Sequence, residues 1–202
     1  MMTKGMRPPD FTSPIDVDAH ISRLPANATT KGMFFNALID RVGGRASRSE
    51  LMYRAGLPES TRFLPFRDYP MAANIRLTAA AAVLLYEREP MGVALHALGR
   101  VAVDAFRESH MGRIVLDALN MDPATLFRLA PRIYGALFNF GRIDFESVSS
   151  TRCRMHVRSM PIFIETFQVG AIESALELSR ARGTVELAID SIADAVVEVS
   201  WE

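Results

Sequence analysis

Hydrophobic and polar residues alternate with a period of two in four runs of the last third of the chain. These runs are residues 142–146, 152–158, 185–190 and 195–201. Successive side chains of a strand point to opposite faces of a sheet, so each run predicts a half-buried strand. Short turns rich in Ser, Thr or Asp join the runs in pairs, which predicts two antiparallel hairpins.

A helical pattern separates the two hairpins. Pro161 suits the first turn of a helix, where a missing N–H costs nothing. Apolar residues then recur at helical spacing to about Arg182, and Gly183 follows at a position typical of a helix end. The sequence therefore predicts one helix over 161–182 between the hairpins.

Helical spacing dominates everything before residue 141. The predicted helices span residues 15–24, 33–42, 48–55, 70–85, 90–108, 114–119 and 122–138. The pattern breaks around 109–112, where a kink or a change of helix is expected. We therefore predict an α+β fold: N-terminal helices packed on a small antiparallel sheet, whose two hairpins flank a helix in the order β-β-α-β-β.

No repeat or change of composition divides the chain. Residues 1–14 hold three prolines and little that could pack, so they are expected to form a flexible N-terminal arm. Residues 15–202 are expected to form a single α+β domain, which their number allows.

The 202 residues include 23 basic and 23 acidic side chains. This balance gives no electrostatic reason to expect nucleic acid as a partner. The single cysteine excludes an intramolecular disulfide and is typical of a reducing compartment. No secretory signal or membrane span is expected, because the start of the chain lacks an apolar core and the longest apolar run is too short. These features favour a cytoplasmic protein.

The two hairpins carry opposite charges on their outer faces. Arg152, Arg154 and Arg158 form an arginine row on the first hairpin, which is a candidate interaction face for an acidic partner or a phosphate. The second hairpin carries acidic residues, namely Glu186, Asp190, Glu198 and Glu202. If both hairpins share one sheet, these charges pair across strands and the row is a neutralised, solvated face.

No specific catalytic motif occurs in the chain. It has no Gly-x-Ser-x-Gly, no Walker loop, no Gly-x-Gly-x-x-Gly and no His-Glu-x-x-His. The histidines are scattered, and His110 stands out because it lies at the predicted break between helices. Cys153 lies on the predicted inner face of its strand, where packing as a small apolar side chain is expected.

The chain is rich in methionine and phenylalanine, with 11 and 12 residues. Such side chains line apolar ligand pockets and also fill cores. The candidate pocket between helices and sheet is lined by the following five residues: Phe106, His110, Met111, Tyr134 and Phe167.

Three segments resemble the markers of a paralogous family of about this length that is abundant in myxobacteria. They run from Lys31 to Leu38 (KGMFFNAL), from Asp68 to Pro70 (DYP) and from Ala94 to Arg100 (ALHALGR). The order of elements also resembles a wider fold group of haem nitric-oxide-binding sensors, 4-vinyl-reductase-type domains and TRAPP-type subunits. That resemblance implies either a bound haem, a small apolar ligand or acyl chain, or a dimerising scaffold.

The haem sensors of that group carry a Tyr-x-Ser-x-Arg motif before the sheet helix. The matching stretch here, 157–161, keeps only Ser159, with Val157 and Pro161 in place of Tyr and Arg. Their haem histidine comes late in the helix before the first hairpin, and residues 126–138 here contain no histidine. The resemblance therefore disfavours haem, and no cofactor is expected.

Three functions follow from these observations. The first is a non-enzymatic regulatory or protein-interaction module, homodimeric, with signalling proteins as partners and a pocket that either holds a small hydrophobic ligand or is filled by its own side chains. The second is an enzyme acting on a small hydrophobic molecule, with His110 or alternatively His156 as acid or base near Tyr134. The third is the disfavoured haem-based gas sensor.

Overall fold

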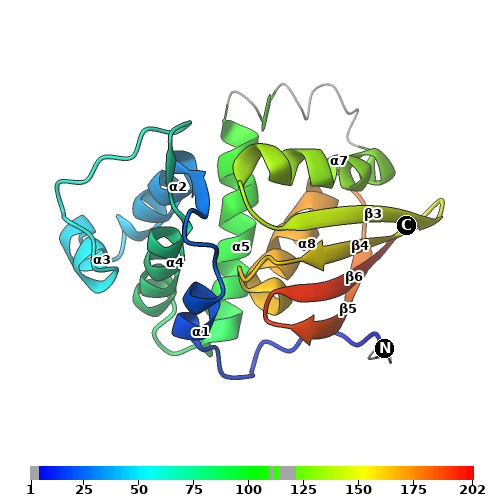
Figure 1. Cartoon of the computed structure of the whole chain (residues 1–202), viewed down its shortest axis with the longest axis horizontal. Helices are drawn as coiled ribbons and strands as arrows, with labels where there is room; N and C mark the ends of the chain where they lie inside the picture. The colour runs from blue at the N-terminus through cyan, green and yellow to red at the C-terminus, as the bar shows by residue number, and fades with distance from the viewer. Residues whose placement is uncertain (1–4, 110–111, 114–121) are drawn as a thin grey trace.

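The computed structural model describes residues 5–109, 112–113 and 122–202 of the chain. Its first half is helical (Figure 1). The helices are α1 (Val17–Ser22), α2 (Gly32–Val42), α3 (Arg48–Arg54), α4 (Met71–Leu85) and α5 (Met91–Glu108). The predicted break at 109–112 and the predicted helix 114–119 lie largely or wholly outside the described residues.

The second half contains the sheet. After α7 (Pro123–Leu137) come β3 (Arg142–Ser149) and β4 (Arg152–Arg158). A π-helical turn, η1 (Ile164–Gln168), leads into α8 (Val169–Leu178), and β5 (Gly183–Ser191) and β6 (Asp194–Trp201) follow. The strands form an antiparallel sheet in the order β3-β4-β6-β5. The predicted α+β fold and its β-β-α-β-β order are confirmed.

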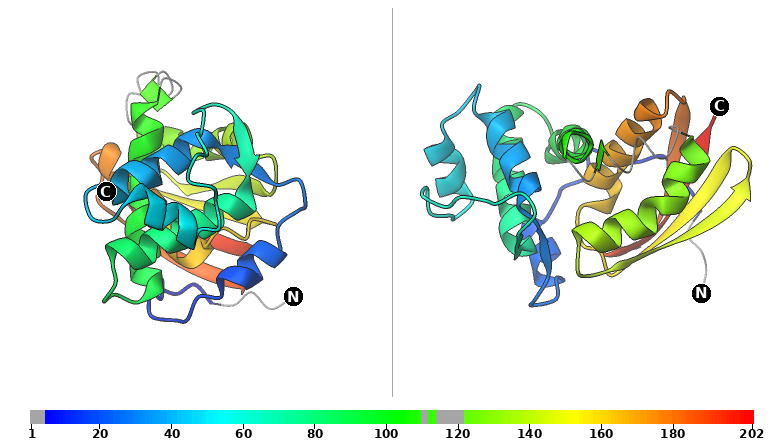
Figure 2. Two further views of the ribbon diagram at one scale, coloured as in Figure 1. Left: turned by 90° about the vertical axis from the view of Figure 1, so that its left-hand side faces the viewer. Right: turned by 90° about the horizontal axis from the view of Figure 1, so that it is seen from above.

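The register of the sheet explains the alternation in the sequence. One row crosses all four strands, with Phe145 opposite Met155, Met155 opposite Val197, and Val197 opposite Leu187. The side chains of such a row share one face. Helices α7 and α8 cover this face, while α5 stands between the sheet and the group of α2, α3 and α4 (Figures 1 and 2). The interior between these layers positions the site described below.

The helix predicted over 161–182 starts later and ends earlier than expected. The Met160 amide donates to the Ala193 carbonyl at 2.9 Å, which ties this segment to the β5–β6 turn. Phe163 then adopts a left-handed conformation, with φ of 55°, before the π-helical turn begins. Tertiary contacts therefore displace the start that Pro161 favours locally. Arg180, with φ of 55°, follows the C-terminal end of α8.

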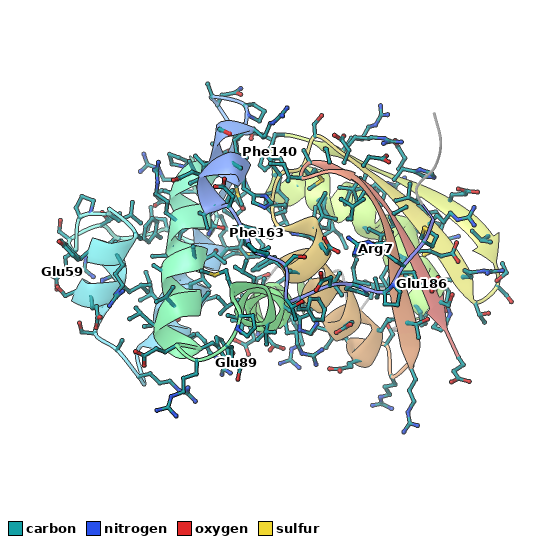
Figure 3. All side chains as sticks on the ribbon, turned by 90° about the horizontal axis from the view of Figure 1, so that it is seen from below. Arg7, Glu59, Glu89, Phe140, Phe163 and Glu186 are labelled. Carbon is teal, nitrogen blue, oxygen red and sulfur yellow. The ribbon has the colours of Figure 1, made fainter. Side chains whose placement is uncertain are left out.

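Two short pairings were not predicted. Strand β1 (Thr29–Lys31) pairs with β2 (Asp68–Pro70) in a second, two-stranded antiparallel sheet. At the other end of the molecule, Arg7 exchanges backbone hydrogen bonds of 2.9 and 2.8 Å with Leu187 of β5. Figure 3 shows Arg7 beside the sheet.

The N-terminal segment has more packing than the sequence suggested. The Phe11 ring lies 4.4 Å from the His96 ring of α5, measured between centroids. Arg7 forms an ion pair with Glu165 at 2.7 Å. The expectation of little that could pack within 1–14 is therefore corrected for residues 7–11, which contact the sheet edge, η1 and α5.

None of the helices in the described ranges combines the length and the hydropathy needed to cross a membrane.

Candidate functional site

A cavity of about 180 Å³ lies between the helices and the inner face of the sheet. Helices α2, α4, α5, α7 and α8, together with residues 160–168, contribute to its walls. Strands β3, β4 and β6 close one side through the apolar residues Ile143, Met155, Val157 and Val197. Figure 3 shows Phe163, another lining residue, in the space between α4 and α8.

The lining is almost wholly apolar. Among the described residues it contains no Asp, Glu, Lys, Arg, His or Cys. The side chains with nitrogen or oxygen in this described lining are those of Asn74, Thr78, Tyr134 and Gln168. Removal of water from such a surface is favourable, so an apolar ligand of matching size gains free energy on entry.

The structure brings three of the five predicted pocket residues together. Phe106 from α5, Tyr134 from α7 and Phe167 from η1 all line the cavity. His110 and Met111 lie outside the described residues. Phe106 and Tyr134 lie on helices whose apolar spacing the sequence displays, whereas Phe167 lies in the π-helical turn η1.

Of the four polar residues in the described lining, the sequence predicted Tyr134 but not Asn74, Thr78 or Gln168. Asn74 follows Met71 by three positions and precedes Thr78 by four, so all three lie on one face of α4. That spacing could have identified Asn74 as a polar residue on a buried face. No local signal marks Gln168, because its partner Tyr134 is 34 positions away in the sequence.

The side chains of Tyr134 and Gln168 are hydrogen-bonded to each other. The Tyr134 hydroxyl donates to Gln168 Oε1, and Gln168 Nε2 donates to the Ile162 carbonyl at 3.3 Å. Burial raises the pKa of Tyr134 well above its ordinary value of 10.0, so its phenol stays protonated. The pair therefore acts as a neutral hydrogen-bonded link between α7 and η1.

Close contact between α5 and α8 fixes one wall. A Cβ added at Gly99 would lie 1.9 Å from the Phe167 carbonyl oxygen, and one added at Gly170 would lie 2.0 Å from that of His96. Both glycines are needed for this approach. It holds Phe167 and Ala171, which line the cavity, against α5.

The segment before α8 is unusual in its backbone. Phe163 has a left-handed φ, which is strained for a residue with a bulky side chain. The turn after it is π-helical and carries the lining residues Phe167 and Gln168. Strain and π-helical turns concentrate at functional sites, so these features agree with the placement of the cavity here.

The arginine row on the outer face is paired within the chain. Arg154 Nε donates to Glu198 Oε2 at 2.7 Å, and Arg152 lies 3.6 Å from Glu198 Oε1. Arg158 lies 3.6 Å from Asp190. The predicted pairing across strands is therefore present for these arginines: Glu198 lies on β6, beside β4, and Asp190 lies on β5, the next strand after β6. Their use as an interaction face stays a prediction.

Cys153 and His20 are buried titratable residues that lie outside the cavity lining. Burial, assisted by the Glu198 carboxylate, raises the pKa of Cys153 to about 12. Burial lowers the pKa of His20 below its ordinary value of 6.5, and His20 Nδ1 lies 3.2 Å from the Pro161 carbonyl. Neither group has the exposure expected of a reactive residue.

Solved structures of H-NOX proteins share this fold. An H-NOX protein from S. oneidensis in the Fe(II)NO ligation state is 14% identical, with a TM-score of 0.69 over 85% of this chain and 99% of that one. Fe(II) unliganded H-NOX from K. algicida is 11% identical, with a TM-score of 0.65 over 85% and 96%. An oxygen-binding H-NOX domain related to soluble guanylate cyclases is 15% identical, with a TM-score of 0.58 over 85% and 95%.

A haem in this cavity would need an axial ligand for its iron and partners for its propionates. Haem iron takes His, Cys, Met or Tyr as an axial ligand, and its propionates are anionic. The described lining offers only methionine sulfurs and Tyr134, whose hydroxyl donates to Gln168. It offers no cation to the propionates, and α7 contains no histidine. The described residues do not fit haem.

No curated protein matches this chain. A family model described as "Protein of unknown function (DUF2378)" matches residues 24–202. This match spans every described helix and strand except α1. The chain belongs to the DUF2378 family of proteins of unknown function.

Proposed function

We propose that this protein is a non-enzymatic regulatory module that binds a small, uncharged and largely apolar molecule in the cavity between its helices and its sheet. One observation carries the proposal: the described lining of the cavity has no charged side chain. An ion would lose its hydration there without gaining a partner, whereas an apolar molecule would gain free energy on leaving water.

The volume of the cavity bounds the size of the ligand. An apolar protein cavity of about 150 Å³ is large enough to bind benzene. The present cavity of about 180 Å³ therefore accommodates a molecule with a single ring or a short branched chain. This is smaller than the pockets of roughly 300–1,000 Å³ that hold drug-sized ligands.

The fold supports the same proposal. The similar H-NOX structures are described with nitric oxide or oxygen as ligands, so this arrangement of helices and sheet is compatible with small-molecule binding. The histidine or cysteine and the cationic groups that would suit haem are missing from the described lining here. A neutral ligand in place of haem accounts for both facts.

Native mass spectrometry of the protein purified from its own or a related host, combined with addition of haem, tests this function. We expect a neutral ligand whose mass is lost on denaturation, and no Soret band after haem addition. Stoichiometric haem binding with a Soret band would refute the proposal. Failure to bind any small aromatic probe in solution would also refute it.

Two further expectations stay predictions. A homodimer formed through helices would show about twice the chain mass by sedimentation at micromolar concentration, and a monomer mass would contradict it. An enzyme using His110 is tested by His110→Ala, since loss of a measured turnover would favour catalysis over binding alone.

A further inference from the structure

One polar group of the cavity lacks a hydrogen-bond partner among the residues that the structure describes. Asn74 is 7% exposed, and its Nδ2 makes no hydrogen bond within the described part of the chain. A buried donor without an acceptor costs about 1–3 kcal/mol of folding free energy. A side chain with this cost is uncommon in a protein interior and calls for an explanation.

The other polar groups of the lining do not share this feature. Tyr134 donates to Gln168, which donates in turn to the Ile162 carbonyl. Thr78 Oγ1 donates to the Asn74 carbonyl oxygen at 2.9 Å. Within the described lining, Asn74 is therefore the residue whose buried side-chain donor makes no hydrogen bond.

We propose that the ligand of this cavity carries one uncharged polar head, a hydroxyl or a carbonyl, and that the carboxamide of Asn74 binds it. This inference rests on the proposed function, because it requires that the cavity takes a small neutral molecule. It adds that the ligand is an amphiphile rather than a hydrocarbon.

The chemistry of the carboxamide fits both types of head. Its NH₂ end donates two hydrogen bonds and its oxygen accepts two. The two ends have nearly the same shape, so a half-turn about the Cβ–Cγ bond exchanges donor and acceptor without repacking. A carboxylate or an ammonium is excluded, since the described lining supplies no opposite charge.

Toluene and phenol are suitable probes, because they have the same shape and size and differ in one methyl or hydroxyl group. Calorimetric titration of the wild-type chain gives the ratio of their dissociation constants, phenol over toluene. We expect Asn74→Leu, which is nearly isosteric, to raise this ratio about tenfold, the value of one good hydrogen bond. Toluene should bind the variant at least as tightly as the wild type.

Thr78→Val is the matched control, because it exchanges a hydroxyl for a methyl in the same wall while the Thr78 hydroxyl is already satisfied by the backbone of α4. We expect it to leave the ratio within twofold. An equal rise in both variants would overturn the role of Asn74. An unchanged ratio in Asn74→Leu, with toluene still bound, would refute this inference and leave the proposed function standing.

Failure of both probes to bind the wild type would instead refute the proposed function.

A second measurement avoids reliance on a variant that folds poorly. In the wild type labelled with ¹⁵N asparagine, phenol should shift the side-chain NH₂ signal of Asn74 by more than toluene does. Equal shifts with both probes would contradict the inference.

Discussion

Gly99 and Gly135 provide a matched test of the helix contact that forms one wall of the cavity. Each lies within a helix, in α5 and α7, so alanine brings a similar intrinsic gain of roughly 0.5–1 kcal/mol at both positions. Nothing lies within 4 Å of a Cβ added at Gly135. We therefore expect Gly135→Ala to raise the free energy of unfolding by about this gain.

At Gly99 the added Cβ would lie 1.9 Å from the Phe167 carbonyl oxygen, whereas ordinary contact begins at 3.4 Å. The backbones of α5 and η1 would have to separate by the difference, 1.5 Å. Overpacking of this kind costs about 1–3 kcal/mol, so we expect Gly99→Ala to lower the free energy of unfolding by about 1–2 kcal/mol after the helix gain.

Urea denaturation followed by circular dichroism measures both changes. The two variants should differ by about 1.5–3 kcal/mol, with opposite signs relative to the wild type. Because Phe167 lines the cavity, Gly99→Ala should also weaken toluene binding, while Gly135→Ala should not. A Gly99→Ala chain as stable as Gly135→Ala would refute the close packing of α5 against η1 and α8.

Three further predictions concern the interior. Ala130 lines the cavity from α7, and Ala136 is exposed on the same helix. Ala130→Leu should therefore weaken toluene binding at least about tenfold in a calorimetric titration. Ala136→Leu should leave toluene binding unchanged. Because burial lowers the pKa of His20, the unfolded chain takes up a proton first as the pH falls through 6.5. The free energy of unfolding should fall over that range in urea titrations, and His20→Phe should remove this part of the pH dependence. Cys153 is 1% exposed and its pKa is about 12, so its thiol should resist a thiol reagent at pH 8 in the native chain and react on unfolding. Fast reaction in native buffer would contradict the buried position.

The sheet could be predicted from the sequence because each strand places most of its apolar residues on one face. The alternation around Met155 and Val197 reports this directly, and their pairing follows once the hairpins share a sheet. The start of α7 could also be predicted, because neighbouring residues determine it. Asp122 accepts a hydrogen bond of 2.8 Å from the Thr125 amide, and Pro123 follows as the first helical residue.

The segment before α8 could not be predicted, because distant contacts determine it. Pro161 favours a helix start locally, but the chain there is non-helical: Met160 donates to the Ala193 carbonyl, and His20 contacts the Pro161 carbonyl. The left-handed Phe163 and the π-helical turn follow from these contacts. No residue type nearby encodes them.

The candidate site was predictable only where local sequence spacing determines it, and not where contacts between distant residues do. Phe106 and Tyr134 lie on apolar helix faces whose spacing the sequence displays. The hydrogen bond between Tyr134 and Gln168 joins residues on separate elements, so the sequence gives no sign of it. The missing partner of Asn74 depends on every neighbour in the interior and required the structure.

Native mass spectrometry of the protein from its own host tests the central claim most directly, because it reports the bound molecule itself. The account predicts a small neutral ligand that carries one hydroxyl or carbonyl group and leaves on denaturation. A retained haem, or an anionic ligand bound in the cavity, would contradict it.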